Sequence, residues 1–131
     1  MALVVPNHGE GDALKAFVNH TAASDLILRL YSSNTTPAET DTAASFTEYS
    51  ATGYSAITLT GSSWTITEGA PSSAAYSQQT YTMTGAGDAY GYYMTRATGG
   101  RLSLAERFTS APFSIPSGGG TIKVTPQITA D

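Results

Sequence analysis

The sequence contains no cysteine and unusually few charged residues. Without cysteine, disulfide bonds, thiolate metal sites and cysteine nucleophiles are all excluded. Six basic and ten acidic residues make up 12% of the chain, whereas about a quarter is usual for a soluble domain. The net charge is −4, and nucleic acids and anionic membranes are bound through basic patches, so we expect neither as a partner.

Motifs for metal binding, phosphate binding or secretion are missing as well. His8 and His20 are the only histidines, and no ligand-like spacing surrounds them, so we predict no metal site. The stretches GAGD and SGGG lack the strand–loop–helix context of phosphate binding and are interpreted as turns. The N-terminal MALVVPN is too short for a signal peptide. We therefore predict no cofactor, and synthesis in a cytoplasm without a signal peptide.

Small and hydroxyl-bearing residues take the place of the missing charge. Threonine and tyrosine suit pleated strands, and serine and glycine suit turns. Short alternating segments, separated by turn signals at regular spacing, predict about eight strands. We therefore predict an all-β protein in which residues 1–131 form a single antiparallel β-sandwich or jelly roll.

Two segments depart from the strand pattern. Within residues 1–20, an expected N-terminal arm, the spacing of Leu14, Phe17 and Val18 predicts one short helix over 9–20 of one or two turns. Residues 33–53 are polar and irregular, and we expect a long surface connection there. Phe46 and Tyr49 are the residues expected to fix this connection to the body of the protein.

Three hairpins are expected in the remainder of the chain. Residues 54–60 and 64–69 are predicted to pair through the turn GSS, and the strand 74–84 is predicted to turn back at GAGD. The third hairpin is AYGYYMTRATGGRLSLAERF, residues 89–108, which combines tyrosine, arginine and glutamate. A three-residue loop at 98–100, with the last glycine left-handed, gives this hairpin its most favourable register.

That register predicts which side chains share a face of the third hairpin. The expected pairs are Arg96 with Leu102, Met94 with Leu104, Tyr92 with Glu106, and Tyr90 with Phe108. The apolar members of these pairs then lie together on the core side.

Glu106 is the acid that this register places on the core side. A buried carboxylate is costly unless it is paired, so we expect a structural partner, either the Tyr92 hydroxyl or the guanidinium of Arg96 or Arg29. An enzyme of the glycosidase type would need a second carboxyl group beside Glu106, and no feature of the sequence places Glu68 there. We therefore predict no catalytic residue and no enzymatic activity.

The opposite face of the third hairpin carries Tyr93, Arg101 and Arg107. Tyrosine and arginine are common anchors of protein interfaces, and Arg107 lies close enough to stack on the Tyr93 ring. These three residues are the candidate protein-contact face. A simple solvated face is the alternative that the sequence leaves open.

Several stretches resemble small virion structural proteins of tailed bacteriophages, of the capsid decoration (cement) type or related fibre-attachment modules. The likeness covers nearly the whole chain and is most distinctive at FTEYSATGY, at the SW strand and at AERF. It also includes LVVPNHGEGDALKAFVN and LILRLYSSNTTPAETDT. These elements are structural patterns, and the resemblance transfers no catalytic residue.

The resemblance implies a function as well as a fold. It implies a β-sandwich, often trimeric, that binds the major capsid protein on the head surface of the virion and bridges neighbouring capsid subunits. The alternative is a receptor- or glycan-binding module of a fibre, tail or baseplate. This alternative needs an exposed aromatic platform, for which Tyr93, Trp64 and Tyr54 are the candidates.

Overall fold

The computed structural model describes residues 3–18, 20 and 23–130. Residues 1, 2 and 19 of the predicted N-terminal arm lie outside the described residues. The described part contains one α-helix, two short 3-10 helices and eleven strands, so the prediction of an all-β protein with one short helix is confirmed. The elements are α1 (Asn7–Phe17), β1 (Leu26–Tyr31), η1 (Ala43–Ser45), β2 (Ile57–Leu59), η2 (Gly61–Ser63), β3 (Thr65–Thr67), β4 (Ser72–Ala75), β5 (Gln79–Met83), β6 (Gly87–Ala89), β7 (Gly91–Arg96), β8 (Leu102–Arg107), β9 (Phe113–Ile115), β10 (Gly120–Val124) and β11 (Gln127–Ala130).

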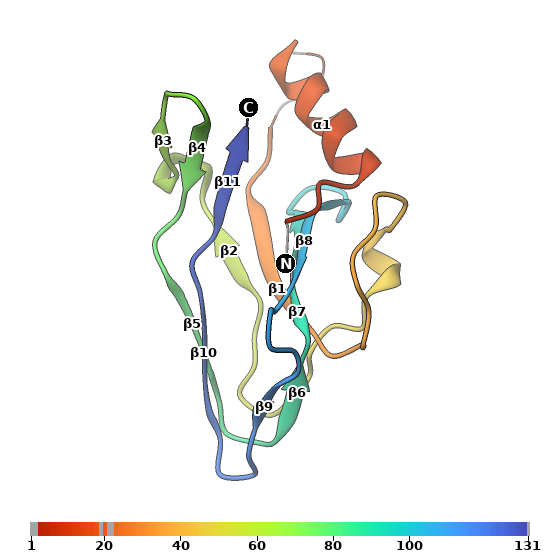
Figure 1. The fold of residues 1–131 in the computed structure, drawn as a ribbon, viewed down its shortest axis with the longest axis vertical. Coiled ribbons are helices and arrows are strands. Elements are labelled where there is room, and N and C mark those ends of the chain that lie inside the picture. The colour runs from red at the N-terminus through yellow and green to blue at the C-terminus, as the bar shows by residue number, and fades with distance from the viewer. Residues whose placement is uncertain (1–2, 19, 21–22, 131) are drawn as a thin grey trace.

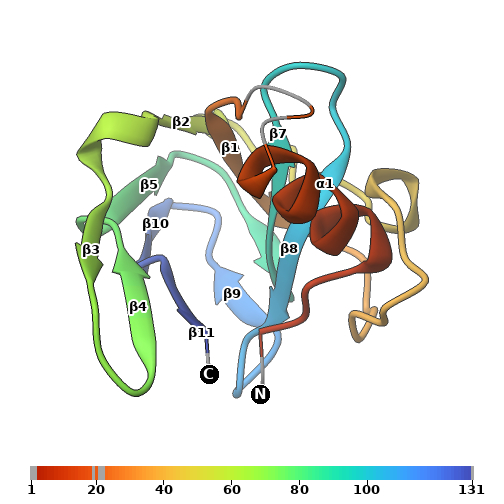
Figure 2. The same ribbon diagram turned by 90° about the horizontal axis from the view of Figure 1, so that it is seen from above.

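The strands form four antiparallel groups. The largest is a four-stranded sheet in the order β2-β1-β7-β8, and the others are β10-β5, β11-β4-β3 and β6-β9. Seen from above, the β5–β10 pair lies opposite the four-stranded sheet, which gives the protein a sandwich-like form (Figures 1 and 2). The strand orders of these four groups do not identify the sandwich as a jelly roll.

The main core lies between the four-stranded sheet and the β5–β10 pair. Leu28 and Leu30 of β1 are fully buried there, opposite Met83 of β5 and Ile122 of β10, each 2% exposed. Both β5 and β10 alternate exposed and buried residues, as expected for strands with one face on a core. A second buried cluster lies on the other face of the four-stranded sheet.

Two of the three predicted hairpins are wrong. Strand β2 pairs with β1, whereas β3 pairs with β4, because the 3-10 turn η2 separates residues 57–59 from residues 65–67. Strand β5 pairs with β10, and β6 pairs with β9, so GAGD joins two ribbons instead of closing a hairpin. Strands β2, β5 and β6 thus take partners distant in sequence, whereas β3 pairs with the next strand along the chain. The partner of β5, β10, shares its core face.

The third hairpin is confirmed, with one change of register. Met94 pairs with Leu104, and Tyr92 pairs with Glu106, as predicted. An irregularity between Met94 and Thr95 then pairs Thr95 with Leu102, instead of Arg96 with Leu102. This bulge turns Leu102 to the opposite face, where it is fully buried in the second cluster.

Helix α1 is longer than predicted and is oriented with its apolar residues outward. It has eleven residues, and Gly9 faces strand β8 so closely that an added Cβ would lie 2.2 Å from the Ser103 carbonyl oxygen. Leu14, Phe17 and Val18 are 67%, 88% and 66% exposed. The helix therefore packs through small residues and leaves its large apolar side chains in solvent.

Candidate functional site

The predicted contact face of the third hairpin is covered by the chain itself. Tyr93 is only 4% exposed, and the Phe46 ring stacks on it with centroids 5.2 Å apart and an interplanar angle of 19°. Phe46 belongs to the 33–53 connection, which folds back over this side of the sheet. The expectation that Tyr93 contacts a partner is therefore wrong, because its ring is already buried within the chain.

Arg107 holds the same connection in place. Its guanidinium donates to the Thr35 carbonyl oxygen at 3.1 Å and to Asn34 Oδ1 at 2.7 Å. It lies 5.3 Å from the centroid of the Tyr90 ring, so the predicted stacking on Tyr93 is replaced by stacking on Tyr90. Arg107 is thus a structural residue that joins β8 to the 33–53 connection.

A second set of polar contacts, which the sequence did not predict, joins the 33–53 connection to β1. Arg29 Nη1 lies 2.9 Å and 2.8 Å from the two carboxylate oxygens of Glu48. The Tyr54 hydroxyl donates to Glu48 at 3.0 Å and accepts from the Leu30 amide at 3.2 Å. Burial is the main cause that raises the pKa of Tyr54. Only the alternation of Arg29 with leucines in β1 could have indicated a need for a nearby acid.

Glu106 has the partner that the register predicted. The Tyr92 hydroxyl donates to Glu106 Oε2 at 2.5 Å, and the carboxylate is half-buried, not fully buried as expected. Burial of the phenol, followed by its hydrogen bond to Glu106, raises the pKa of Tyr92. The pair connects neighbouring strands β7 and β8 directly.

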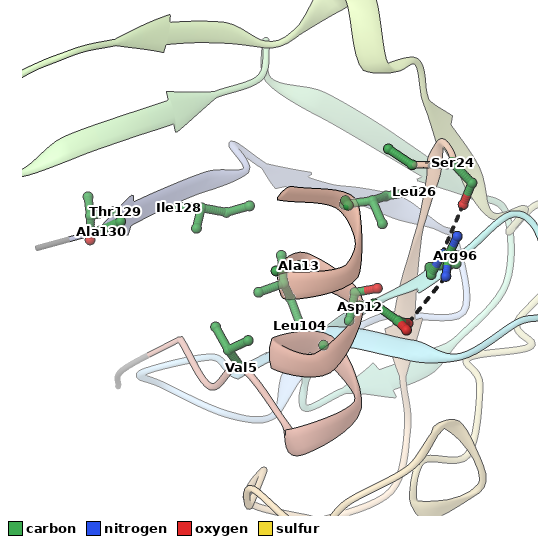
Figure 3. A pocket seen from close by; sticks show the side chains of 14 residues that line it. Val5, Asp12, Ala13, Ser24, Leu26, Arg96, Leu104, Ile128, Thr129 and Ala130 are labelled. Carbon is green, nitrogen blue, oxygen red and sulfur yellow. Dashed lines mark hydrogen bonds and ion pairs between the residues drawn. The ribbon is translucent and has the colours of Figure 1, made fainter. Parts of the chain in front are cut away.

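The candidate site lies at the other end of the molecule, beside α1. A cavity of about 360 Å³ opens between α1, the start of β1, β7–β8 and the C-terminal strand β11. Figure 3 shows Val5, Ala13, Leu26, Leu104 and Ile128 around this space. Most of its lining is aliphatic, which suits an apolar ligand or side chain.

Asp12 and Arg96 are the charged residues in the lining of this cavity, and Arg101 and Lys15 pair with Asp12 from outside the lining. Asp12 Oδ2 lies 3.5 Å from Arg96 Nη1 and 3.3 Å from Arg101 Nε, and Asp12 Oδ1 lies 3.9 Å from Lys15 Nζ. Asp12 Oδ2 is buried, and these ion pairs lack the geometry of hydrogen bonds. Arg96 also donates to the Ser24 hydroxyl at 3.3 Å (Figure 3). Of the predicted contact residues, Arg101 alone therefore contacts a residue that lines this site.

The surface around the cavity is apolar as well. Leu14, Phe17 and Val18 protrude from the exposed side of α1. A second, shallower hollow of about 210 Å³ lies over Ile66, Ala74 and Ile128, and Ile128 lines both cavities. The apolar surface thus extends from α1 across β11 to the β3–β4 ribbon at the top of Figure 1. The helical spacing in the sequence predicted that these side chains share one face of a helix, but not that this face is exposed to solvent.

The aromatic platform required for glycan binding is not formed by the residues proposed for it. Tyr93 is buried, and the half-buried Tyr54 stacks on Tyr81 with ring centroids 5.5 Å apart. Trp64 is half-buried and packs edge-on against Tyr76. Among the described residues, none of these three rings is fully exposed.

Comparisons with protein-family models, with curated proteins and with solved structures found no match to this chain. Within the described residues, no group of three histidine or acidic side chains is placed to hold a metal ion. In the same residues no helix has the length and apolar character needed to cross a membrane.

Proposed function

We propose that the protein is a non-enzymatic virion structural protein of the capsid-decoration type, which binds across neighbouring subunits of a shell. The observation that supports this proposal is the apolar surface of α1. Leu14, Phe17 and Val18 lie within one turn or so of each other, and each is at least 66% exposed. Contiguous exposed apolar patches are uncommon on proteins that act alone and typically mark interaction sites.

The location of the binding surface differs from the sequence prediction. Tyr93 and Arg107 serve the chain's own 33–53 connection, so the proposed contact moves to α1 and the adjoining cavity. Neutral, hydroxyl-rich strands elsewhere leave this end as the most apolar part of the described surface. A shell offers many identical sites, so modest contacts repeated over many copies would give stable decoration.

The partner in this proposal is the major capsid protein, and the protein itself is proposed to be a homo-oligomer, with a trimer favoured by the resemblance. Each copy would present α1 to the shell from the head surface of the virion. Burial of three large apolar side chains would contribute about 1.5–3 kcal/mol each before the costs of association.

Co-sedimentation with shells tests this function. Shells are assembled from the major capsid protein encoded nearest to this gene and are mixed with the purified protein. We expect the wild type to pellet with shells and the double variant Leu14→Ser, Phe17→Ser to remain in the supernatant. Phe113→Ser is the matched control, because Phe113 is also exposed (49%) but lies on β9 at the opposite end of the molecule (Figure 1).

Two results would count against this proposal, the first against decoration and the second against α1 as the contact. One is a wild type that stays monomeric by mass measurement and neither pellets with shells nor raises their melting temperature. The other is equal pelleting of the wild type and the α1 double variant, which would remove α1 from the contact.

A further inference from the structure

We infer that the cavity beside α1 is a socket for one bulky apolar side chain carried by an acidic segment of the partner protein. This inference rests on the proposed function, and it adds the chemistry of the segment that is bound. It follows from the lining of the cavity, the charges at its edge and the exposure of those charges.

The lining determines what can enter the cavity. Aliphatic side chains from the N-terminal arm, α1, β1, β8 and β11 surround a volume of about 360 Å³. These elements are distant in sequence, and only the folded chain brings them together (Figure 3). The volume exceeds that of one water molecule by about tenfold, so a leucine-sized or phenylalanine-sized group fits without rearrangement. Apolar pockets with a few convergent polar groups are the usual form of a binding site.

The charge at the cavity edge determines what flanks the apolar group. Three of the six basic residues in the chain, Lys15, Arg96 and Arg101, lie within ion-pair distance of the single carboxylate of Asp12. These four side chains sum to +2, so the rest of a chain of net charge −4 sums to −6. Asp25, which follows the lining residue Ser24, is engaged by the Gly61 amide at 2.8 Å. A local excess of positive charge in an acidic protein favours an acidic partner segment.

Exposure divides these four side chains into two roles. Asp12 and Arg96 have side chains that are only 9% and 13% exposed, so they hold α1 against β7. Arg101 and Lys15 are 42% and 44% exposed and contact Asp12, a lining residue, without lining the cavity themselves. They can reach carboxylates of a bound segment while they keep contact with Asp12. Because they are solvated, their contribution is to selectivity and association rate, and it is screened by salt.

A second copy of this chain is the less suitable occupant. The apolar side chains that a second copy would offer from its own α1, Leu14 and Phe17, flank Lys15. Docking them would bring a further cation against an edge that already carries excess positive charge. A segment in which acidic residues flank the apolar group would instead be attracted by these cations.

A pair of synthetic peptides tests the inference on the purified full-length protein. Both have one central phenylalanine, flanked by glutamates in one peptide and by lysines in the other. Binding is followed by two-dimensional amide NMR at low salt. We expect the acidic peptide to shift the amide signals of Ala13, Ser24 and Ile128, and to bind about tenfold more tightly than the basic one, with the difference shrinking as salt is added.

Two variants locate the binding with matched controls. Ala16→Leu fills the cavity from an exposed helical position and should abolish binding, whereas His8→Leu adds the same side chain to α1 outside the cavity and should not. Arg101→Gln should weaken binding of the acidic peptide by several-fold, whereas Lys123→Gln removes the same charge from an exposed site on β10 and should not.

The inference is overturned if neither peptide binds the wild type, if both bind equally, or if Ala16→Leu leaves binding unchanged. It is also overturned if the protein self-associates and Ala16→Leu alone disperses it, since a second copy would then occupy the cavity. If the protein pellets with shells but binds neither peptide, the cavity is not the contact and the proposed function stands. Peptide binding without pelleting would remove decoration and keep the socket.

Discussion

At the residue scale, tyrosine hydroxyls do much of the cross-linking that charged pairs do in other proteins. The buried Tyr81 hydroxyl donates to the Leu28 carbonyl oxygen at 2.8 Å and so ties β5 to β1 across the core. Tyr31 donates to the Thr35 carbonyl oxygen at 3.1 Å, and Tyr92 donates to Glu106. Each phenol combines a large apolar body with one polar end, which suits a chain with few charges.

Removal of the Tyr92 hydroxyl is expected to destabilise the protein. In Tyr92→Phe the half-buried Glu106 carboxylate loses its charged hydrogen bond, and we expect a loss of about 1–2 kcal/mol in the free energy of unfolding, measured by urea denaturation. Tyr90→Phe is the control, because the Tyr90 hydroxyl makes no hydrogen bond to any described residue, and it should change stability by less than about 0.5 kcal/mol. Equal effects of the two variants would show that the Glu106 contact has no energetic importance.

At the scale of elements, the sequence predicted strands and the third hairpin better than it predicted partners. Alternation located β1, and glycines located the turn between β7 and β8, where Gly99 and Gly100 both have positive φ. The alternation could not show the bulge. Its extra residue, Ser103, lies where α1 approaches β8, and that contact joins segments distant in sequence. The orientation of α1 was equally hidden, because helical spacing identifies an apolar face without saying what lies against it.

The packing of α1 predicts opposite effects for its two glycines. In Gly9→Ala the new methyl group would overlap the Ser103 backbone, so α1 must move away from β8, and we expect a loss of about 1–3 kcal/mol. In Gly11→Ala nothing lies within 4 Å of the added Cβ, so the better helix former should stabilise the protein by about 0.5–1 kcal/mol. Thermal denaturation of both variants measures the difference. A neutral Gly9→Ala would mean that α1 does not rest on β8 in solution.

The 33–53 connection behaves as an element of the fold, although it contains little regular structure. Its residue Phe46 is 6% exposed and closes the second buried cluster over Tyr31 and Tyr93. Phe46→Ala should cost about 3–5 kcal/mol, and limited proteolysis should then cut within 33–53. Thr47→Ala, at the exposed neighbouring position, should leave both stability and the cleavage pattern unchanged. Resistance of the Phe46 variant to protease would show that the polar contacts of Arg29 and Arg107 hold the connection without the Phe46 ring.

At the scale of the whole molecule, the two sides of the four-stranded sheet have separate roles. One side forms the main core with β5 and β10, the other is covered by the 33–53 connection, and α1 packs against β8. The sequence supplied the residues of the candidate site, such as Arg101 and Leu14, but not their assembly. Asp12, Arg96 and Ile128 come from the two ends and the middle of the chain, so no local pattern could group them.

The many buried phenols predict that the whole fold fails at alkaline pH. Burial raises the pKa of Tyr31 from 10.0 to about 12, and it also raises the pKa values of Tyr49, Tyr54, Tyr81, Tyr92 and Tyr93. In the unfolded chain these phenols lose protons near pH 10, so between pH 10 and 12 the unfolded state binds fewer protons than the folded state. Stability is therefore fully present below pH 10 and falls as the pH rises toward 12.

Circular dichroism and tyrosinate absorbance, recorded together during a pH titration, measure this loss. We expect the buried tyrosines to ionise in one cooperative step that coincides with loss of β-sheet signal between pH 10 and 12. Tyr90→Phe is the control, because the Tyr90 hydroxyl makes no hydrogen bond to any described residue. It should leave the midpoint of that step in place, whereas Tyr81→Phe should shift it. Gradual ionisation of all tyrosines near pH 10 with the sheet signal intact would contradict the burial of these rings, because ionised phenols cannot remain inside an apolar core without a compensating cation.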